Sequence, residues 1–183
     1  MQGFLEGYRV LDLTDEKGHL CGRILGDMGA DVIKVEPPGG DPSRNIGPFY
    51  HDEPHPEKSL PWSYSNANKR GVTLNLETPE GREIFKEMVK QSDIVVESFR
   101  PGYLAELGLD YDSLAAIKPD IILTSITPFG QSGPRAQYKV TDLVAISMGG
   151  MAYVFGDEDR APVRISQPQA YFLGGQHAAA GTP

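Results

Sequence analysis

Short apolar runs alternate with amphipathic stretches through the first two thirds of the chain. Tyr8 to Leu13 and Asp31 to Val35 form the first two runs. A short apolar run bounded by turn residues is typical of a buried strand, and apolar side chains three or four residues apart are typical of a helix. The segment between the two runs has this helical spacing, at Leu20, Cys21, Ile24, Leu25 and Met28.

The alternation continues along the chain. Val72 to Leu76 predicts a third strand, and Thr78 followed by Pro79 is a favourable start for a helix. That helix is expected to turn inward the side chains of Ile84, Phe85, Met88 and Val89. The later elements are a strand at Ile94 to Val96, a helix around Leu114 to Ile117 and a strand within Asp120 to Ile126.

Strands and helices in this order predict an α/β fold, in which a parallel sheet carries helices on both faces. Functional residues of such sheets collect on loops that follow the carboxyl ends of strands. We therefore expect a site where Thr14 to Gly18, Ser98 to Gly102 and Thr127 to Gly133 come together. The apolar stretch Met148 to Phe155 is expected to belong to the core.

Composition agrees with a globular domain, or a piece of one: 183 residues, 39% hydrophobic and 23% charged. A formal net charge of −8 argues against a general nucleic-acid or anionic-membrane surface, but a local basic pocket for a small phosphate-bearing molecule remains open. The single cysteine, Cys21, has no internal disulfide partner, and the first residues lack the pattern of a secretory signal. We therefore predict a cytoplasmic protein without membrane spans.

The segment from Pro37 to Pro61 is rich in Pro, Gly, Asp and His and is predicted to be a long excursion without packed elements. His51 and His55 have the spacing of metal ligands on a helix. Pro54 and Pro56 would break that helix, so no metal site is predicted.

Phosphate-binding signals are weak. Thr14 to Gly18 contains neither the dinucleotide-binding glycine fingerprint nor a P-loop, so Glu36 is interpreted as a strand-end carboxylate rather than a ribose ligand. The adjacent cations Lys69 and Arg70 remain open to two interpretations, contact with phosphates or solvated surface charge.

Several segments taken together are more specific than any one of them. They are Val10 to Thr14, Gly29 to Pro38, Asn66 to Arg70, Leu74 to Leu76, Glu97 to Gly102, Phe129 to Pro134, Asp142 and Gly149-Gly150. In combination they resemble the N-terminal part of the family III CoA-transferases, the group that includes formyl-CoA and carnitine CoA-transferases.

The resemblance implies a Rossmann-like large domain whose strand-end loops bind CoA, in chains that interlock as rings to form a dimer. Residues 1–183 would be this N-terminal CoA-binding domain, with a small second domain and a return of the chain beyond it. The substrates would be a CoA thioester and a carboxylic acid, with no metal. Candidate CoA-binding residues are Lys69, Arg70, Ser98, Phe99, Arg100 and Lys139.

Three features of the candidate CoA site depart from the family pattern. Ser98 replaces the usual asparagine, and Glu106 stands where a basic residue is common, so its carboxylate would repel phosphates. The loop Asp15 to His19 is one residue shorter than in formyl-CoA transferases. Whether CoA binds this chain is therefore left open.

The family reads Pro-x-x-Asp-x-x-x-Gly-x-His near the end of this region, and the resemblance implies that its aspartate attacks the acyl-CoA thioester. Here Gly175 and His177 fix the register and Tyr171 takes the place of that aspartate. A phenol with a pKa of ~10 is mostly un-ionised at neutral pH, and an aryl ester is not the mixed anhydride that the exchange requires. Tyr171 is interpreted as filling the vacated pocket, with a role as general acid as the alternative.

Racemase chemistry of the same superfamily requires a His and Asp pair, and the matching positions hold Thr141 and Tyr171. The favoured hypothesis is a non-catalytic subunit that pairs with a homologous aspartate-bearing subunit in a CoA-transferase. One alternative is a non-enzymatic protein that binds CoA or acyl-CoA. Another is a self-sufficient enzyme that uses a different carboxylate, at Asp142, Asp157, Glu158 or Asp159.

Overall fold

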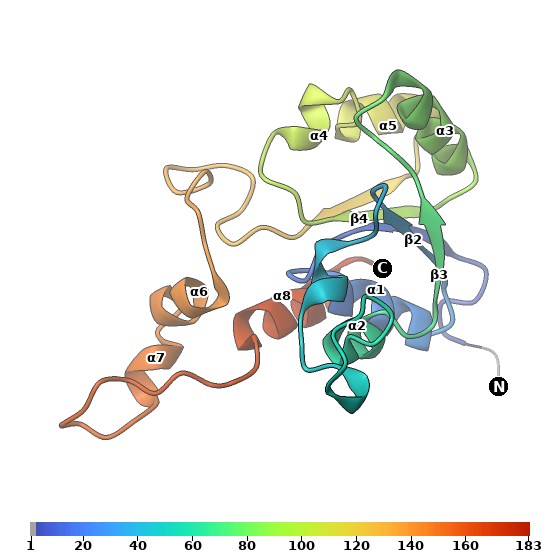
Figure 1. The fold of residues 1–183 in the computed structure, drawn as a ribbon. Coiled ribbons are helices and arrows are strands. Elements are labelled where there is room, and N and C mark those ends of the chain that lie inside the picture. The colour runs from blue at the N-terminus through green and yellow to red at the C-terminus, as the bar shows by residue number, and fades with distance from the viewer. Residues whose placement is uncertain (1–2) are drawn as a thin grey trace.

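The computed structural model describes residues 3–183, in which five strands form one parallel sheet in the order β3-β2-β1-β4-β5 (Figure 1). The strands are β1 (Arg9–Leu13), β2 (Asp31–Glu36), β3 (Lys69–Thr73), β4 (Ile94–Glu97) and β5 (Ile122–Ser125). The α-helices are α1 (His19–Asp27), α2 (Leu60–Ser65), α3 (Pro79–Lys90), α4 (Tyr103–Glu106), α5 (Tyr111–Ile117), α6 (Asp142–Met148), α7 (Met151–Val154) and α8 (Gln169–Gly181).

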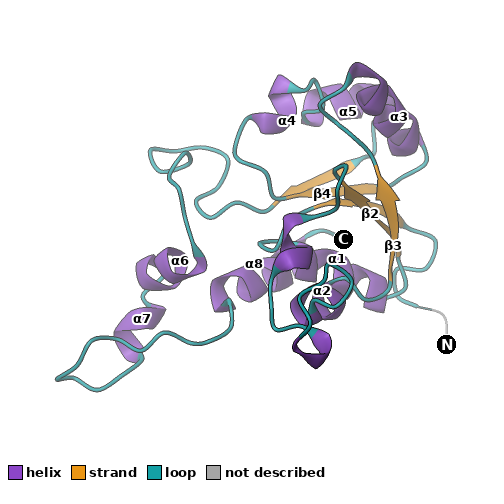
Figure 2. Cartoon of the chain, in the orientation of Figure 1, coloured by secondary structure: helices purple, strands orange, loops and turns teal. Residues whose placement is uncertain are grey.

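Helices cover both faces of the sheet (Figure 2). Side chains alternate across each strand. Leu11 and Val95 therefore pack with α3 and α5 on one face, whereas Val10 and Val96 pack with α1 and α8 on the other. The predicted α/β fold with a doubly covered parallel sheet is confirmed. Among the helices of residues 3–183, none combines the length and apolar character needed to cross a bilayer.

Helix α3 begins as its sequence predicts, with one exception on its inner face. The Thr78 hydroxyl accepts a hydrogen bond from the Gly81 N–H at 3.1 Å, which caps the helix. Phe85 and Val89, four residues apart, are fully buried. Ile84 is 54% exposed, so its predicted inward orientation is wrong: it precedes Phe85 by one position and is rotated about 100° away from the buried stripe.

The predicted third strand was misplaced. Strand β3 pairs with β2 from Lys69 to Thr73, and only one further hydrogen bond, from Leu74 N–H to the Glu36 carbonyl, follows before the chain leaves the sheet. Leu76 lies outside the strand. The apolar pattern did not locate this strand, because β3 lies at the edge of the sheet and its residues are exposed or half-buried.

The segment from Pro37 to Pro61 is more ordered than predicted. It contains the 3₁₀ turns η1 (Pro42–Asn45) and η2 (Tyr50–Asp52), and α2 begins within it. Asp41, Ser43 and Ser59 are buried, and Ser59 donates a hydrogen bond to the Ile46 carbonyl at 2.6 Å. The prediction of an excursion without packed elements is therefore wrong, because polar side chains rather than apolar ones anchor it.

Helices α6 and α7 stand away from the sheet, and the chain then returns through α8 to lie along α1 (Figure 1). Tyr153 is 93% exposed and Val154 72% exposed, so the expectation that Met148 to Phe155 is core is wrong for the described chain. At the return, Gly175 lets the two helices approach closely, because a Cβ there would lie 3.0 Å from the Leu20 Cβ.

We expect Gly81→Ala to lower the free energy of unfolding by about 1–3 kcal/mol, although alanine is the better helix former. A Cβ at this position would lie 1.8 Å from the Asn75 carbonyl oxygen, so the backbone must shift. Urea unfolding of the full-length protein measures the effect. Gly174→Ala is the matched control in α8, where the nearest atom is 3.9 Å away. Equal stability of the two variants would contradict the close packing at Gly81.

Candidate functional site

Loops that follow β1, β4 and β5 meet at the carboxyl edge of the sheet, as the sequence predicts. The Ser98 hydroxyl accepts a hydrogen bond from the Asp15 N–H at 2.8 Å and donates one to the Asp15 carboxylate at 2.7 Å. Gln131, after β5, donates to the buried Glu97 carboxylate at 3.3 Å, and Phe99 N–H donates to the same group at 2.6 Å. Side chains therefore join the three loops to one another.

Tyr171, in the first turn of α8, borders two cavities at this edge. The smaller has a volume of about 150 Å³ and is lined on the side of the strand-end loops by Lys17 and Thr127. The larger, of about 700 Å³, is lined by parts of residues 43–48, α2, residues 141–142 and residues 164–172. A cavity of this size beside Tyr171 means that the phenol side chain does not fill the space around it.

The environment of Tyr171 keeps its hydroxyl un-ionised. Burial raises the pKa of the phenol above its ordinary value of 10, and the negative charges of Glu16, Asp142 and Asp15 raise it further. A phenol in such surroundings remains a hydrogen-bond donor at neutral pH. It is a weak nucleophile for the same reason.

Asp142 holds the start of α8. It is 5% exposed, and its Oδ1 accepts hydrogen bonds from the backbone N–H groups of Ala170, at 2.8 Å, and Tyr171, at 3.4 Å. Its Oδ2 is buried without a partner, as is the hydroxyl of Thr127. These are the two side-chain polar atoms of this kind within residues 3–183. Buried polar atoms normally find partners, so these two are exceptions. They belong to residues that line the cavities, Asp142 the larger and Thr127 the smaller, but neither atom is itself accessible from the cavity.

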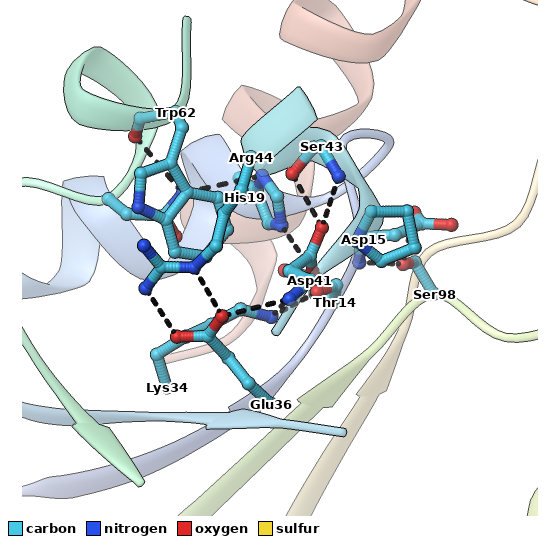
Figure 3. A network of polar contacts seen from close by, with 12 residues as sticks. Thr14, Asp15, His19, Lys34, Glu36, Asp41, Ser43, Arg44, Trp62 and Ser98 are labelled. Carbon is cyan, nitrogen blue, oxygen red and sulfur yellow. Dashed lines mark hydrogen bonds and ion pairs between the residues drawn. The ribbon is translucent and has the colours of Figure 1, made fainter. Parts of the chain in front are cut away.

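Behind the larger cavity lies a buried ion cluster, formed by Asp12, His19, Lys34, Asp41 and Lys69. Figure 3 shows three of its members, His19, Lys34 and Asp41. The Lys69 ammonium lies 2.7 Å from the Asp12 carboxylate. Lys34 lies 3.8 Å from Asp12 and 3.6 Å from Asp41, and His19 Nε2 lies 3.2 Å from Asp41. The cluster connects three strands, α1 and the segment after β2.

Charge distribution in the cluster follows from burial and proximity. Burial alone would raise the pKa of Asp12, but Lys69 and Lys34 hold it well below the ordinary range. The pKa of Asp41 is also held low against its burial, by the hydrogen bond from His19 and by the Lys34 charge. Burial lowers the pKa of His19 below its ordinary value of 6.5; the contact with Asp41 opposes this shift, and the Lys34 and Lys69 charges add to it. The imidazole is therefore neutral at pH 7.

Lys69 and Arg70, which the sequence left open as phosphate contacts, are both paired with carboxylates of the protein. The three N–H donors of Lys69 go to Asp12, the His19 carbonyl and Asn66, which leaves no proton for a phosphate. Arg70 forms an exposed pair with Asp31 at the amino edge of the sheet. The carboxyl edge is one strand length away, roughly 15 Å.

Ser98 and Phe99 lie at the carboxyl edge, and the Phe99 ring packs 4.8 Å from that of Tyr103. Arg100 is ion-paired with Glu106, so the expected repulsion of phosphates by Glu106 is offset by its neighbour. Lys139 is exposed, directly before a residue that lines the smaller cavity, and it makes no ion pair with another residue of 3–183.

The other candidate carboxylates are separated from the cavities. Asp157, Glu158 and Asp159 lie in an exposed loop after α7, and none of them lines either cavity. His51 and His55 are exposed as well. In the part of the chain from residue 3 onward, no cluster of three or more His, Cys, Asp or Glu side chains is arranged to hold a metal ion.

Several residues of the larger cavity were not identified from the sequence. Trp62, Tyr64 and Phe172 supply aromatic walls, and Arg164 supplies a cation. No local motif marks them, since α2 and α8 become neighbours only in the fold. The ion cluster had a detectable signal, because Asp12 and Lys34 interrupt otherwise apolar strands at facing positions.

The sequence model of CoA-transferase family III matches residues 5–183. The chain is 42% identical over 175 residues to the succinyl-CoA:(R)-benzylsuccinate CoA-transferase subunit BbsE of Thauera aromatica, covering 96% of this chain and 43% of that protein. It is 41% identical over 162 residues to the succinyl-CoA–L-malate CoA-transferase beta subunit of Chloroflexus aurantiacus, covering 87% of this chain and 39% of that protein.

A solved structure of a CAIB/BAIF family protein from Brucella suis superposes on 98% of this chain, with a TM-score of 0.90 and 37% sequence identity. The superposition covers 48% of that protein. The chain thus spans less than half the length of these relatives.

Lys69→Met should lower the free energy of unfolding by about 3–5 kcal/mol, because it leaves the buried Asp12 carboxylate without its main partner. Arg70→Met is the matched control one residue away. It breaks an exposed pair and should cost less than about 1 kcal/mol. Chemical denaturation of both variants measures the difference, and similar losses would contradict the buried role of Lys69.

The free energy of unfolding should decrease as the pH drops from about 7 to about 5. The unfolded chain takes up a proton on His19 near its ordinary pKa of 6.5, whereas the folded chain, with its lowered pKa, does not. His19→Gln should remove a slope of up to about 1.4 kcal/mol per pH unit, measured by denaturation at several pH values. His55→Gln, which replaces a histidine at an exposed site, is the control for the loss of an imidazole as such. An unaltered slope in His19→Gln would show that this imidazole takes up its proton equally in the folded and unfolded states, and would contradict the lowered pKa.

Proposed function

The chain belongs to CoA-transferase family III, and we propose that it is the subunit of a CoA-transferase that does not form the covalent intermediate. A homologous subunit carrying an aspartate at the position of Tyr171 would supply the nucleophile. The assembly would move CoA between a CoA thioester and a carboxylic acid. The single observation that carries this proposal is the phenol at position 171, which burial and three carboxylates keep un-ionised.

Names of two relatives support a heteromer. The protein from T. aromatica is described as a subunit of its transferase, and the protein from C. aurantiacus as a beta subunit. In this proposal residues 1–183 form the N-terminal CoA-binding domain of a chain that interlocks with its partner in the cytoplasm. Ser98, Phe99, Arg100 and Lys139 remain its candidate CoA contacts, and Lys69 and Arg70 act in the fold instead.

A self-sufficient enzyme is the second candidate, and Asp142 is the carboxylate that favours it, because its Oδ2 lies buried and unpartnered beside the larger cavity. A nucleophile must come within about 3–3.5 Å of the thioester carbon. Asp142 would have to reach the thioester carbon while its Oδ1 accepts hydrogen bonds from the first turn of α8. This requirement makes it a weaker candidate than an aspartate in a partner subunit. A protein that only binds CoA predicts binding without any transfer in either arrangement.

A CoA-transfer assay with a radiolabelled carboxylic-acid acceptor tests the proposal. We expect the full-length protein alone to be inactive and its mixture with an aspartate-bearing homologue to transfer CoA. Tyr171→Phe should leave the activity of the mixture within about twofold of that of the unaltered protein, since the phenol takes no part in the chemistry.

Two further outcomes separate the alternatives. Transfer by the protein alone, abolished in Asp142→Asn, would establish the self-sufficient enzyme and overturn the proposal. CoA binding without transfer by the protein or the mixture would identify a binding protein. A loss of more than about tenfold in the Tyr171→Phe mixture would assign the phenol a catalytic role, such as general acid.

A further inference from the structure

We propose that the larger cavity beside Tyr171 binds a bulky apolar acyl group, preferably an aromatic one, presented as a neutral thioester, and that it does so without covalent reaction. The proposal rests on the proposed function, since it names the ligand class of the same site. It adds two properties that the family assignment does not supply, a preference for size and a preference against free carboxylate anions.

The size of the cavity suits a large acyl group better than a very small one. Its volume is about 700 Å³. Pockets of about 300–1,000 Å³ enclose drug-sized ligands, and a formyl or acetyl group would leave most of this space to water. Tyr171 lines one side of the space without filling it.

Aromatic and aliphatic side chains form most of the wall. Tyr64 of α2 and Phe172 of α8 both line the cavity, and their ring centroids lie 6.2 Å apart at an angle of 53°. The guanidinium of Arg23 covers Tyr64 at 4.2 Å, and that of Arg44 covers Trp62 at 4.1 Å, so cations fix these rings. Further apolar lining comes from Ile46, Pro48 and Leu60.

The charges around the cavity favour a neutral ligand. Two acids, Glu16 and Asp142, line it together with one cation, Arg164. His19 also lines it, and its imidazole is neutral because burial lowers its pKa. The lining is therefore net negative, and a free carboxylate entering it would be repelled. A thioester carries no such charge.

Truncated thioesters test the proposal separately from CoA binding and transfer. The probes are the N-acetylcysteamine thioesters of 3-phenylpropionic acid and of propionic acid, and free 3-phenylpropionate, each titrated calorimetrically into the full-length protein. These probes have no nucleotide, so a failure of the transfer assay does not affect the result. The aryl thioester should bind at least about tenfold more tightly than either of the other probes.

Variants of Phe172 locate the binding. Phe172→Ala should weaken the aryl thioester at least about fivefold, and Phe172→Leu, which keeps apolar volume and guards against misfolding, should weaken it less. Tyr153→Ala, at an exposed aromatic outside the cavity, should have no effect. Equal affinities for the three probes, no binding of the aryl thioester, or insensitivity to Phe172→Ala would each overturn the proposal. A covalent adduct on the protein would also overturn it.

Discussion

Burial of opposite charges at the centre of the sheet is the constraint on which the rest of the structure depends. Asp12 is fully buried between Lys34 and Lys69, whose side chains are themselves almost completely shielded from solvent. Such a group is tolerated only if its counter-charges are held in place, since an unpaired buried carboxylate is strongly destabilising. The side chain of Lys34 and the turn around Asp41 are fixed by this requirement. The segment after β2 is thereby held against α1, where it forms a wall of the larger cavity.

The site depends on a second fixed point, at the start of α8. Asp142 accepts the first backbone N–H groups of that helix and so sets the position of Tyr171. Helix α8 can then lie along α1 because Gly175 permits close approach. Tyr171 and Phe172 of α8 thus line one side of the larger cavity, and Trp62 and Tyr64 of α2 line the other. The resulting space combines apolar walls with a negative edge, which suits a neutral apolar ligand better than an anion.

Family membership indicates an enzyme that reacts with a thioester, whereas the residue at position 171 indicates a chain without the nucleophile. A partner subunit would reconcile the two. Membership of CoA-transferase family III calls for chemistry on a thioester, whereas an un-ionised phenol offers a hydrogen bond rather than an attacking carboxylate. Under the proposed function, a division of labour between homologous subunits would resolve the difference. In that arrangement the cavity beside Tyr171 would keep the shape of a site without the reacting group, and its ligand would bind without being transformed.

The sequence alone determined the alternation of strands and helices, the parallel sheet, the family and the Thr78 cap, because each is encoded in local periodicity or in contiguous motifs. It did not place β3, the exposure of Met148 to Phe155 or the anchoring of Pro37 to Pro61. These depend on edge position and on partners distant in the chain. Only the tertiary structure decided that Lys69 forms a buried ion pair with Asp12 while Arg70 faces solvent. The reason is that adjacent side chains of a strand point to opposite faces. It alone brought α2 and α8 together as a cavity, because no local pattern records which distant helices become neighbours.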